Sequence, residues 1–217
     1  MNWQRARTDD KKNERKAAIY QAAYTLFKEK GYDAVSFNGI AAQAGFTKSN
    51  MYRYFSSKED IFLNVFGDLF ENWFEDCISD LKAYEMDVDS HHFAKTWCNT
   101  LLKHPEFLDL TPLMFISLEA NSSYEQLIEF KRNSKNLLYQ LALEIGRVYP
   151  ALQGENAFQF LTLSYAASTN YWAGSKQNDA LTKVYALEEF KDLKPDFERN
   201  LINSIVIIIN GIKAEQG

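Results

Sequence analysis

The sequence predicts an all-α protein with a small basic N-terminal domain, residues 1–56, and a larger acidic helical domain, residues 57–217. Apolar residues recur at helical spacing, and no long stretch alternates apolar and polar residues as a half-buried strand does. Residues 1–60 hold 11 Lys and Arg against 7 Asp and Glu, whereas residues 61–217 hold 13 against 22. This asymmetry favours a nucleic-acid-binding face attached to a body with a different task.

The first helix is expected from about residue 10 to residue 30. Its apolar residues form one helical stripe at i, i+3, i+4, i+7 and i+8: Ile19, Ala22, Ala23, Leu26 and Phe27. Gly31 follows as a C-terminal stop, because glycine readily takes the left-handed conformation that ends helices. Six basic residues precede the stripe and form an arm suited to phosphate: Arg5, Arg7, Lys11, Lys12, Arg15 and Lys16.

Two short helices come next. Ser36 is a suitable N-cap for a helix over residues 37–44. After a break at Gly45, Thr47 can cap a second short helix over residues 48–55.

A long helix then joins the two domains. Ser56 and Glu59 match the S-x-x-E capping box, so this helix should start there and run to about residue 83. Breaks in the remaining sequence, at segments rich in Pro, Gly and polar residues, imply about five further helices.

A short helix, a glycine turn and a second short helix make a helix-turn-helix arrangement. Ile40, Ala41 and Ala44 give the first of these helices a small apolar face. Met51 and Phe55 give the second an apolar inner side. Held by that side, the second helix can present its outer side to a DNA major groove about 12 Å wide.

The outer side is polar and positive, with no carboxylate between Val35 and Ser57. It carries Lys48, Ser49, Asn50, Tyr52, Arg53 and Tyr54. Asn50 and Arg53 are residue types that read base edges. Thr47, Lys48 and Tyr52 suit phosphate oxygens, as do the backbone amides at the two helix N-termini. The alternative is a helical hairpin with a generic basic surface.

Residues 14–62 resemble the N-terminal domain of TetR-type transcriptional repressors. The resemblance rests on Ala22, Ala23, Leu26, Phe27 and Gly31-Tyr32, on Ile40-Ala41-x-x-Ala44-Gly45-Phe46-Thr47-Lys48, and on Tyr52-x-x-Phe55-x-x-Lys58-Glu59. It implies an all-helical homodimer whose two heads bind a palindromic operator in double-stranded DNA.

The resemblance also implies roles for single residues. Those that match the family's phosphate contacts are Ser36, Phe37, Thr47, Lys48, Tyr52 and Lys58. Those that match positions near base edges are Ser49, Asn50 and Arg53. Two positions depart from the usual pattern: Gly39 stands where a charged or polar residue is common, and Ser49 stands where glycine is common. These departures keep open an interaction adaptor whose head no longer binds DNA.

In the family, the C-terminal domain supplies the dimer interface and in many members encloses a small-molecule pocket. Residues 108–132 are similar to one subgroup of these domains. The residues we expect to line a pocket are Trp97, Phe115, Glu119, Asn121, Tyr165, Asn170 and Trp172. Aromatic residues at helical spacing equally fit a core. Glu119 follows an apolar run and needs a partner, which is a cationic ligand or, more simply, Lys131, Arg132 or a backbone amide.

The last helix predicts a dimer independently. Residues 205–209 are apolar almost all round, so this helix must be buried on two sides, and residues 157–173 show a similar pattern. The expected interface residues are Ala166, Ala167, Leu201, Ile205, Ile208, Ile209 and Ile212. The alternative is a pair of core helices in a monomer.

Other chemistry is sparse. Cys77 and Cys98 cannot make a disulfide framework. His91 and His92 fit a solvated loop better than a metal site, and no catalytic or cofactor motif is present. There is no secretory signal, and the longest aliphatic run has five residues, whereas a membrane span needs roughly 18. We therefore predict a cytoplasmic, ligand-responsive repressor without a cofactor, whose effector is an unknown small molecule, rather than a helical enzyme.

Overall fold

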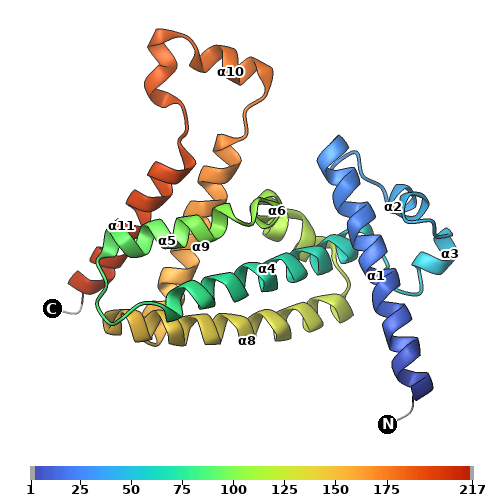
Figure 1. Cartoon of the computed structure of the whole chain (residues 1–217). Coiled ribbons are helices and arrows are strands. Elements are labelled where there is room, and N and C mark those ends of the chain that lie inside the picture. The colour runs from blue at the N-terminus through green and yellow to red at the C-terminus, as the bar shows by residue number, and fades with distance from the viewer. Residues whose placement is uncertain (1–2, 216–217) are drawn as a thin grey trace. The chain divides into compact units, whose positions relative to one another are not determined.

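The computed structural model describes residues 3–215, with side chains from Asn13 onward. Figure 1 shows the order of the elements along the chain. Within the described residues every regular element is a helix, as the sequence predicts. The chain divides into two compact units: residues up to Asp68 together with Leu113–Asn133, and Leu69–Pro112 together with the chain from Ser134 onward.

The first unit holds the N-terminal helices. They are α1 (Trp3–Lys30), α2 (Phe37–Gln43), α3 (Lys48–Met51) and the start of α4 (Lys58–Lys82). The same unit contains η2 (Met114–Leu118), α7 (Glu119–Asn121) and the start of α8 (Tyr124–Val148). Helix α1 starts earlier than the apolar stripe predicts, because residues 3–18 contain no Gly or Pro and are rich in good helix formers.

The predicted caps of the two short helices are confirmed. The Ser36 side chain accepts a hydrogen bond from the Gly39 amide, and the Thr47 side chain accepts one from the Asn50 amide. Gly31 and Gly45 have φ angles of 75° and 74°, in the left-handed region that favours glycine after a helix.

The cap predicted for α4 is wrong by one residue. Ser57, not Ser56, caps the helix, with its hydroxyl accepting from the Asp60 amide at 3.1 Å. Glu59 instead accepts a hydrogen bond from the Tyr32 hydroxyl at 3.1 Å. The shift arises because Asp60, rather than Glu59, turns back toward the start of the helix.

Asp60 is fully buried and joins two distant parts of the first unit. One carboxylate oxygen accepts from the Ser56 amide at 2.9 Å. The other accepts from the amide of Ser123 at 2.8 Å and from its hydroxyl at 3.0 Å. These bonds tie the start of α4 to the residues just before α8, and Asn64 adds a side-chain bond to Gln126 at 2.7 Å.

The second unit is a helical bundle built from the rest of α4 and α8 with five further α-helices and short 3-10 turns. Its other elements are α5 (Ser90–Leu102), α6 (Pro105–Leu110), η1 (Thr111–Leu113), η3 (Pro150–Leu152), α9 (Glu155–Ser175), α10 (Asp179–Tyr185), η4 (Glu188–Leu193) and α11 (Phe197–Ala214). Helix α11 packs against α5 and α9. The core of the second unit is aromatic. The ring centre of Trp97 lies 5.1 Å from that of Phe160 and 5.6 Å from that of Trp73.

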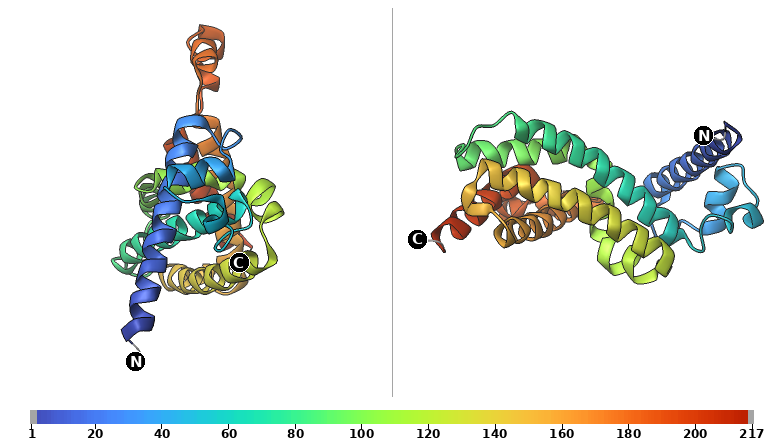
Figure 2. Two further views of the ribbon diagram at one scale, coloured as in Figure 1. Left: turned by 90° about the vertical axis from the view of Figure 1, so that its right-hand side faces the viewer. Right: turned by 90° about the horizontal axis from the view of Figure 1, so that it is seen from below.

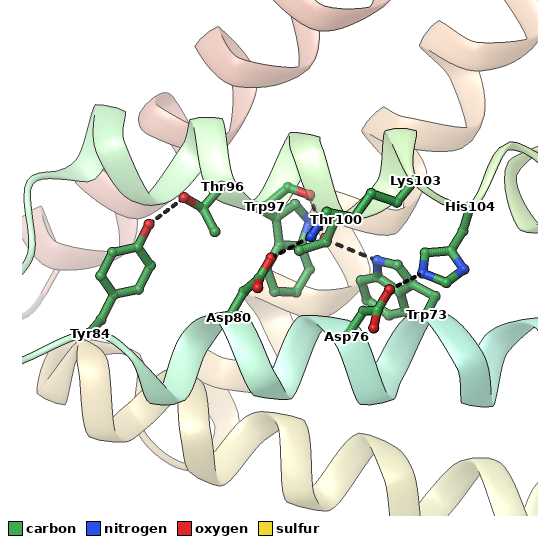
Figure 3. Close-up of polar contacts among 9 residues, drawn as sticks. All are labelled: Trp73, Asp76, Asp80, Tyr84, Thr96, Trp97, Thr100, Lys103 and His104. Carbon is green, nitrogen blue, oxygen red and sulfur yellow. Dashed lines mark hydrogen bonds and ion pairs between the residues drawn. The ribbon is translucent and has the colours of Figure 1, made fainter.

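Polar contacts join α4 and α5 beside this aromatic core (Figure 3). The Trp73 indole donates to the Thr100 hydroxyl at 3.1 Å, so the buried indole nitrogen is satisfied. His104 and Lys103 lie 2.9 Å and 3.0 Å from Asp76 and Asp80, respectively. Over residues 3–215, none of the helices combines the length and apolar character that crossing a membrane requires.

We predict that Asp60→Ala lowers the free energy of unfolding by about 3 kcal/mol, because it removes the buried acceptor of three part-buried hydrogen bonds from Ser56 and Ser123. Urea denaturation followed by circular dichroism measures this. Asp33→Ala, which removes an exposed carboxylate of the same unit, is the control and should change stability by less than about 0.5 kcal/mol. Equal stability of the two variants would contradict a structural role for the Asp60 bonds.

Candidate nucleic-acid interface

The turn between α2 and α3 is a tight glycine turn. The amides of Gly45 and Phe46 donate to the carbonyls of Ala42 and Ala41 at 3.2 and 2.8 Å. On the inner side, Ile40 and Ala41 are buried, with 0% and 3% of their surface exposed. The turn therefore sets the direction of α3 relative to α2 through backbone bonds and apolar burial.

Helix α3 is too short to form alone, since isolated helices below about 12 residues are marginal in water. Hydrogen bonds of the helical type continue past Met51, with the Tyr52 amide donating to Lys48 and the Phe55 amide to Met51, both at 3.1 Å. Met51 and Phe55 are 0% and 3% exposed. Burial of this inner side holds the helix in place and leaves its other side to solvent.

The predicted outer side is exposed except at Tyr54. Exposed predicted site residues are Ser36, Thr47, Lys48, Ser49, Asn50, Tyr52 and Arg53, whereas Phe37, Tyr54 and Lys58 are half-buried. The Phe37 ring stacks on the Tyr52 ring at 4.9 Å and 27°, and the Lys48 ammonium lies 5.7 Å from the Tyr52 ring centre. This stack joins the first residue of α2 to the C-cap residue of α3, and Lys48 at the start of α3 lies beside the same Tyr52 ring.

Lys58 has a structural role that sequence analysis missed. Its ammonium donates to the carbonyls of Tyr32 and Val35, each at 3.1 Å, and lies 4.2 Å from the Tyr32 ring centre. The Tyr32 hydroxyl also accepts from the Ser117 hydroxyl at 2.9 Å, and burial raises its pKa. Lys58 therefore fastens the loop that leads into α2.

Gly39, one of the departures from the family pattern, has a local explanation. A Cβ atom at this position would lie 3.2 Å from the Ser36 hydroxyl oxygen, which is the α2 cap. In the basic arm, Arg15 is exposed and Lys16 half-buried. The side chains of Arg5, Arg7, Lys11 and Lys12 lie outside the described residues.

The predicted pocket residues fall into both compact units. In the first unit, Phe115 is 63% exposed, Asn121 is exposed, and Glu119 pairs with Lys131, one of the partners expected for it. In the second unit, Asn170 is exposed and Trp97 is a core residue. The structure thus assigns Glu119 a partner within the chain.

Tyr165 and Trp172, both on α9, form hydrogen bonds to residues in and just after α6. Tyr165 donates to the Thr111 carbonyl at 3.2 Å, and the Trp172 indole donates to Asp109 at 3.0 Å. Lys176 completes this cluster, 3.0 Å from Asp109 and 3.8 Å from the Trp172 ring centre. Sequence analysis missed Asp109, whose partners are more than 60 residues away and leave no local pattern.

Some of the residues predicted for the dimer interface are buried within the protomer, and others are exposed or half-buried. Leu201, Ile205, Ile209 and Ile212 are at most 4% exposed, because they pack in the protomer's own bundle. They need no second protomer to be covered. Ala166 is exposed, and Ala167 and Ile208 are half-buried. The exposed apolar residues of the same two helices that sequence analysis missed are Leu163 and Ile207, 42% and 69% exposed.

A helix-turn-helix head with an exposed basic face, joined to a helical bundle, defines the class of helical regulators that bind DNA. Residues 19–65 match the family model for bacterial regulatory proteins of the tetR family, and residues 68–216 match the tetracyclin repressor-like C-terminal domain. The chain belongs to the TetR family of transcriptional regulators, a family of regulators and not of enzymes.

Individual relatives match over about a quarter to a third of the chain. An uncharacterised HTH-type transcriptional regulator of Bacillus subtilis, YfiR, is 36% identical over 58 residues, 27% of this chain and 28% of its own length. The HTH-type transcriptional regulator RutR of Escherichia coli is 33% identical over 73 residues, 34% of this chain and 32% of its own. The aligned stretches thus span less than two thirds of either relative.

Solved structures share the fold along nearly the whole chain. The fatty acid degradation regulator FadR of Bacillus halodurans superposes with a TM-score of 0.55 at 18% identity, over 90% of this chain and 98% of its own. A TetR-family regulator from Syntrophomonas wolfei gives 0.53 at 18% identity, over 94% and 96%. At this identity the likeness concerns the fold alone.

No group of three or more His, Cys, Asp or Glu side chains is arranged to hold a metal ion among the residues that the structure describes. Both cysteines are buried, and burial raises the pKa of the Cys98 thiol to about 12. A thiol with so high a pKa is almost entirely protonated at neutral pH and is a poor nucleophile.

We predict that Lys58→Met weakens DNA binding without changing its salt dependence, because the Lys58 ammonium is bound to two carbonyls. The measurement is the dissociation constant for one duplex at several salt concentrations. The control is Lys48→Met, an exposed lysine, which should lower the slope of log Kd against log salt by about 0.9. The same loss of slope for Lys58→Met would show that Lys58 neutralises a phosphate instead.

Proposed function

We propose that this protein is a ligand-responsive transcriptional repressor that binds a palindromic operator as a homodimer. The observation that carries the proposal is the exposed, carboxylate-free face of α3, which buried Met51 and Phe55 hold in one orientation. A solvated helix ordinarily mixes charges of both signs. Residues 36–56 carry two positive charges, Lys48 and Arg53, and no carboxylate, which suits a phosphate-lined groove.

The exposed side chains suit two kinds of DNA contact. Ser49 and Asn50 are exposed on α3 and Arg53 is exposed in the turn that follows it; all three suit base edges, with half-buried Tyr54 next in the chain. The phosphate contacts we propose are Ser36, Phe37, Thr47, Lys48 and Tyr52. The N-terminal amides of α2 and α3 lie beside these residues and favour anions. Lys58 belongs to this interface through the loop that it fastens.

We place the dimer contact on the exposed sides of α9 and α11. Neither residues 156–175 nor residues 200–212 include a charged side chain. Exposed Leu163, Ala166 and Ile207 lie on these helices, with half-buried Ala167 and Ile208. Long uncharged stretches of helix that keep apolar residues exposed after the protomer has folded are suited to helix pairing across a two-fold axis.

In this proposal residues 1–56 form the DNA-binding head and residues 57–217 form the body, which binds a small-molecule effector of unknown identity. Helix α4 contributes residues to both compact units, so it is the element we expect an effector to act through. Such a regulator has a state that binds the operator and a state that does not. An effector shifts the balance between these two states only to the extent that it binds them with different affinities. A regulator of this kind acts where the chromosome is, so we expect it in the cytoplasm.

We expect Arg53→Ala to lower affinity for an operator obtained by random-sequence selection by about 1–3 kcal/mol and to flatten discrimination against other sequences. Lys48→Ala should instead weaken binding to every duplex alike. Fluorescence anisotropy titrations measure both. Arg199→Ala, an exposed arginine of the second unit, serves as the control. If neither head variant differs from that control, α3 does not contact DNA. That result would favour the alternative of an interaction adaptor whose head no longer binds DNA.

We expect Ile207→Glu to raise the dimer dissociation constant at least about a hundredfold, because a buried unpaired charge costs about 3–5 kcal/mol. Sedimentation velocity over a range of concentrations measures it. Leu143→Glu, at an equally exposed leucine on α8, is the matched control and should leave the dimer unchanged. A dimer that tolerates Ile207→Glu would place the interface elsewhere.

A further inference from the structure

Between α9 and α11 the chain leaves the bundle and returns as a projecting segment, residues 176–195, which we call the arm. It contains α10 and η4 and projects in orange in Figure 1 and in the left view of Figure 2. Helix α10 packs chiefly on η4, within the arm itself. The arm is therefore a helical excursion whose tip is not covered by the bundle from which it comes.

The base of the arm is firmly anchored. Lys176 is paired with Asp109 at 3.0 Å and lies over the Trp172 ring. The Trp172 ring meets the Phe197 ring edge-on at 5.1 Å. Pro195 packs on Gly174, where a Cβ atom would lie 3.9 Å from the proline ring. These contacts fix both ends of the arm and hence its direction from the bundle.

The tip of the arm exposes apolar side chains. No residue of α10 or η4 is buried. Leu181 and Val184 are each 40% exposed, Leu187 is 51% exposed and Leu193 is 67% exposed. Ordering a residue costs roughly 1–2 kcal/mol of backbone entropy, and apolar burial is what normally offsets it. The arm therefore carries apolar surface that its own protomer leaves uncovered and that a partner surface can bury.

The charge of the arm narrows the kind of surface that covers it. Residues 176–195 hold four Lys and four Asp or Glu, so the arm is neutral as a whole. A segment without net charge has no net electrostatic attraction to phosphate, which argues against DNA or an anionic membrane as its partner. Exposed leucines on a neutral helix instead fit an apolar protein surface.

We propose that the arm packs against the second copy of this chain and clasps the dimer. The inference rests on the dimer contact proposed for α9 and α11. The arm leaves the end of α9 and enters the start of α11, so it adjoins the two helices on which we place the dimer contact, and its exposed apolar residues extend the apolar surface available to a second copy. Because a two-fold interface is self-complementary, each protomer covers the other's arm, and both arms become buried in one assembly.

The test compares two double variants of the full chain. Leu181→Ser with Leu187→Ser removes apolar surface from the arm. Leu102→Ser with Leu143→Ser is the matched control, because it changes two other exposed leucines of the same unit. Circular dichroism checks that both fold, and sedimentation with fluorescence detection measures the dimer dissociation constant. The arm variant should weaken the dimer about tenfold or more, and the control should not.

Hydrogen exchange provides a second readout that does not depend on an arm substitution. Amides of residues 181–187 should be protected in the wild-type dimer and should exchange faster in monomeric Ile207→Glu. Equal exchange in the two forms, or an arm variant that dimerises like the control, overturns the clasp while leaving the α9–α11 contact intact. A wild-type protein that stays monomeric would overturn both the clasp and the proposed dimer.

Discussion

Burial of Met51 and Phe55 beneath α3 is the constraint on which the proposed function depends. A helix of four residues has no stability of its own, so its direction comes from its buried inner side and from the Thr47 cap. Once that inner side is fixed, the polar outer side has only one way to face. The Phe37–Tyr52 stack then sets the N-terminus of α2 beside it, so that the proposed base-reading and phosphate-binding groups form one surface.

The head is in turn tied to a segment far along the chain. Buried Asp60 accepts two bonds from Ser123, and the Tyr32 hydroxyl accepts one from Ser117. Residues from Leu113 to Asn133 therefore fold in the same compact unit as the helix-turn-helix. Since Tyr32 also carries the carbonyl that Lys58 binds, a displacement of this segment has a short bonded route to the loop before α2. This gives the proposed effector response a physical starting point.

The sequence predicted the local features well and the distant contacts poorly. The caps at Ser36 and Thr47 and the glycine turn follow from residue types a few positions apart, and the structure has them. The Asp60–Ser123 bonds join residues 63 positions apart and leave no such pattern, so the α4 cap was assigned one residue too early. The apolar run from Ile205 to Ile209 predicted burial on two sides, but the pattern could not show that the protomer's own bundle covers Ile205 and Ile209 and leaves Ile207 69% exposed.

The most direct test of the central claim is an anisotropy titration of the protein against the DNA upstream of its own gene and against a scrambled duplex, at several salt concentrations. TetR regulators bind DNA, and the account predicts tight binding to the upstream duplex that weakens steeply with salt, with much weaker binding to the scrambled one. Absence of binding to either duplex at low salt would contradict the claim that the outer face of α3 reads DNA.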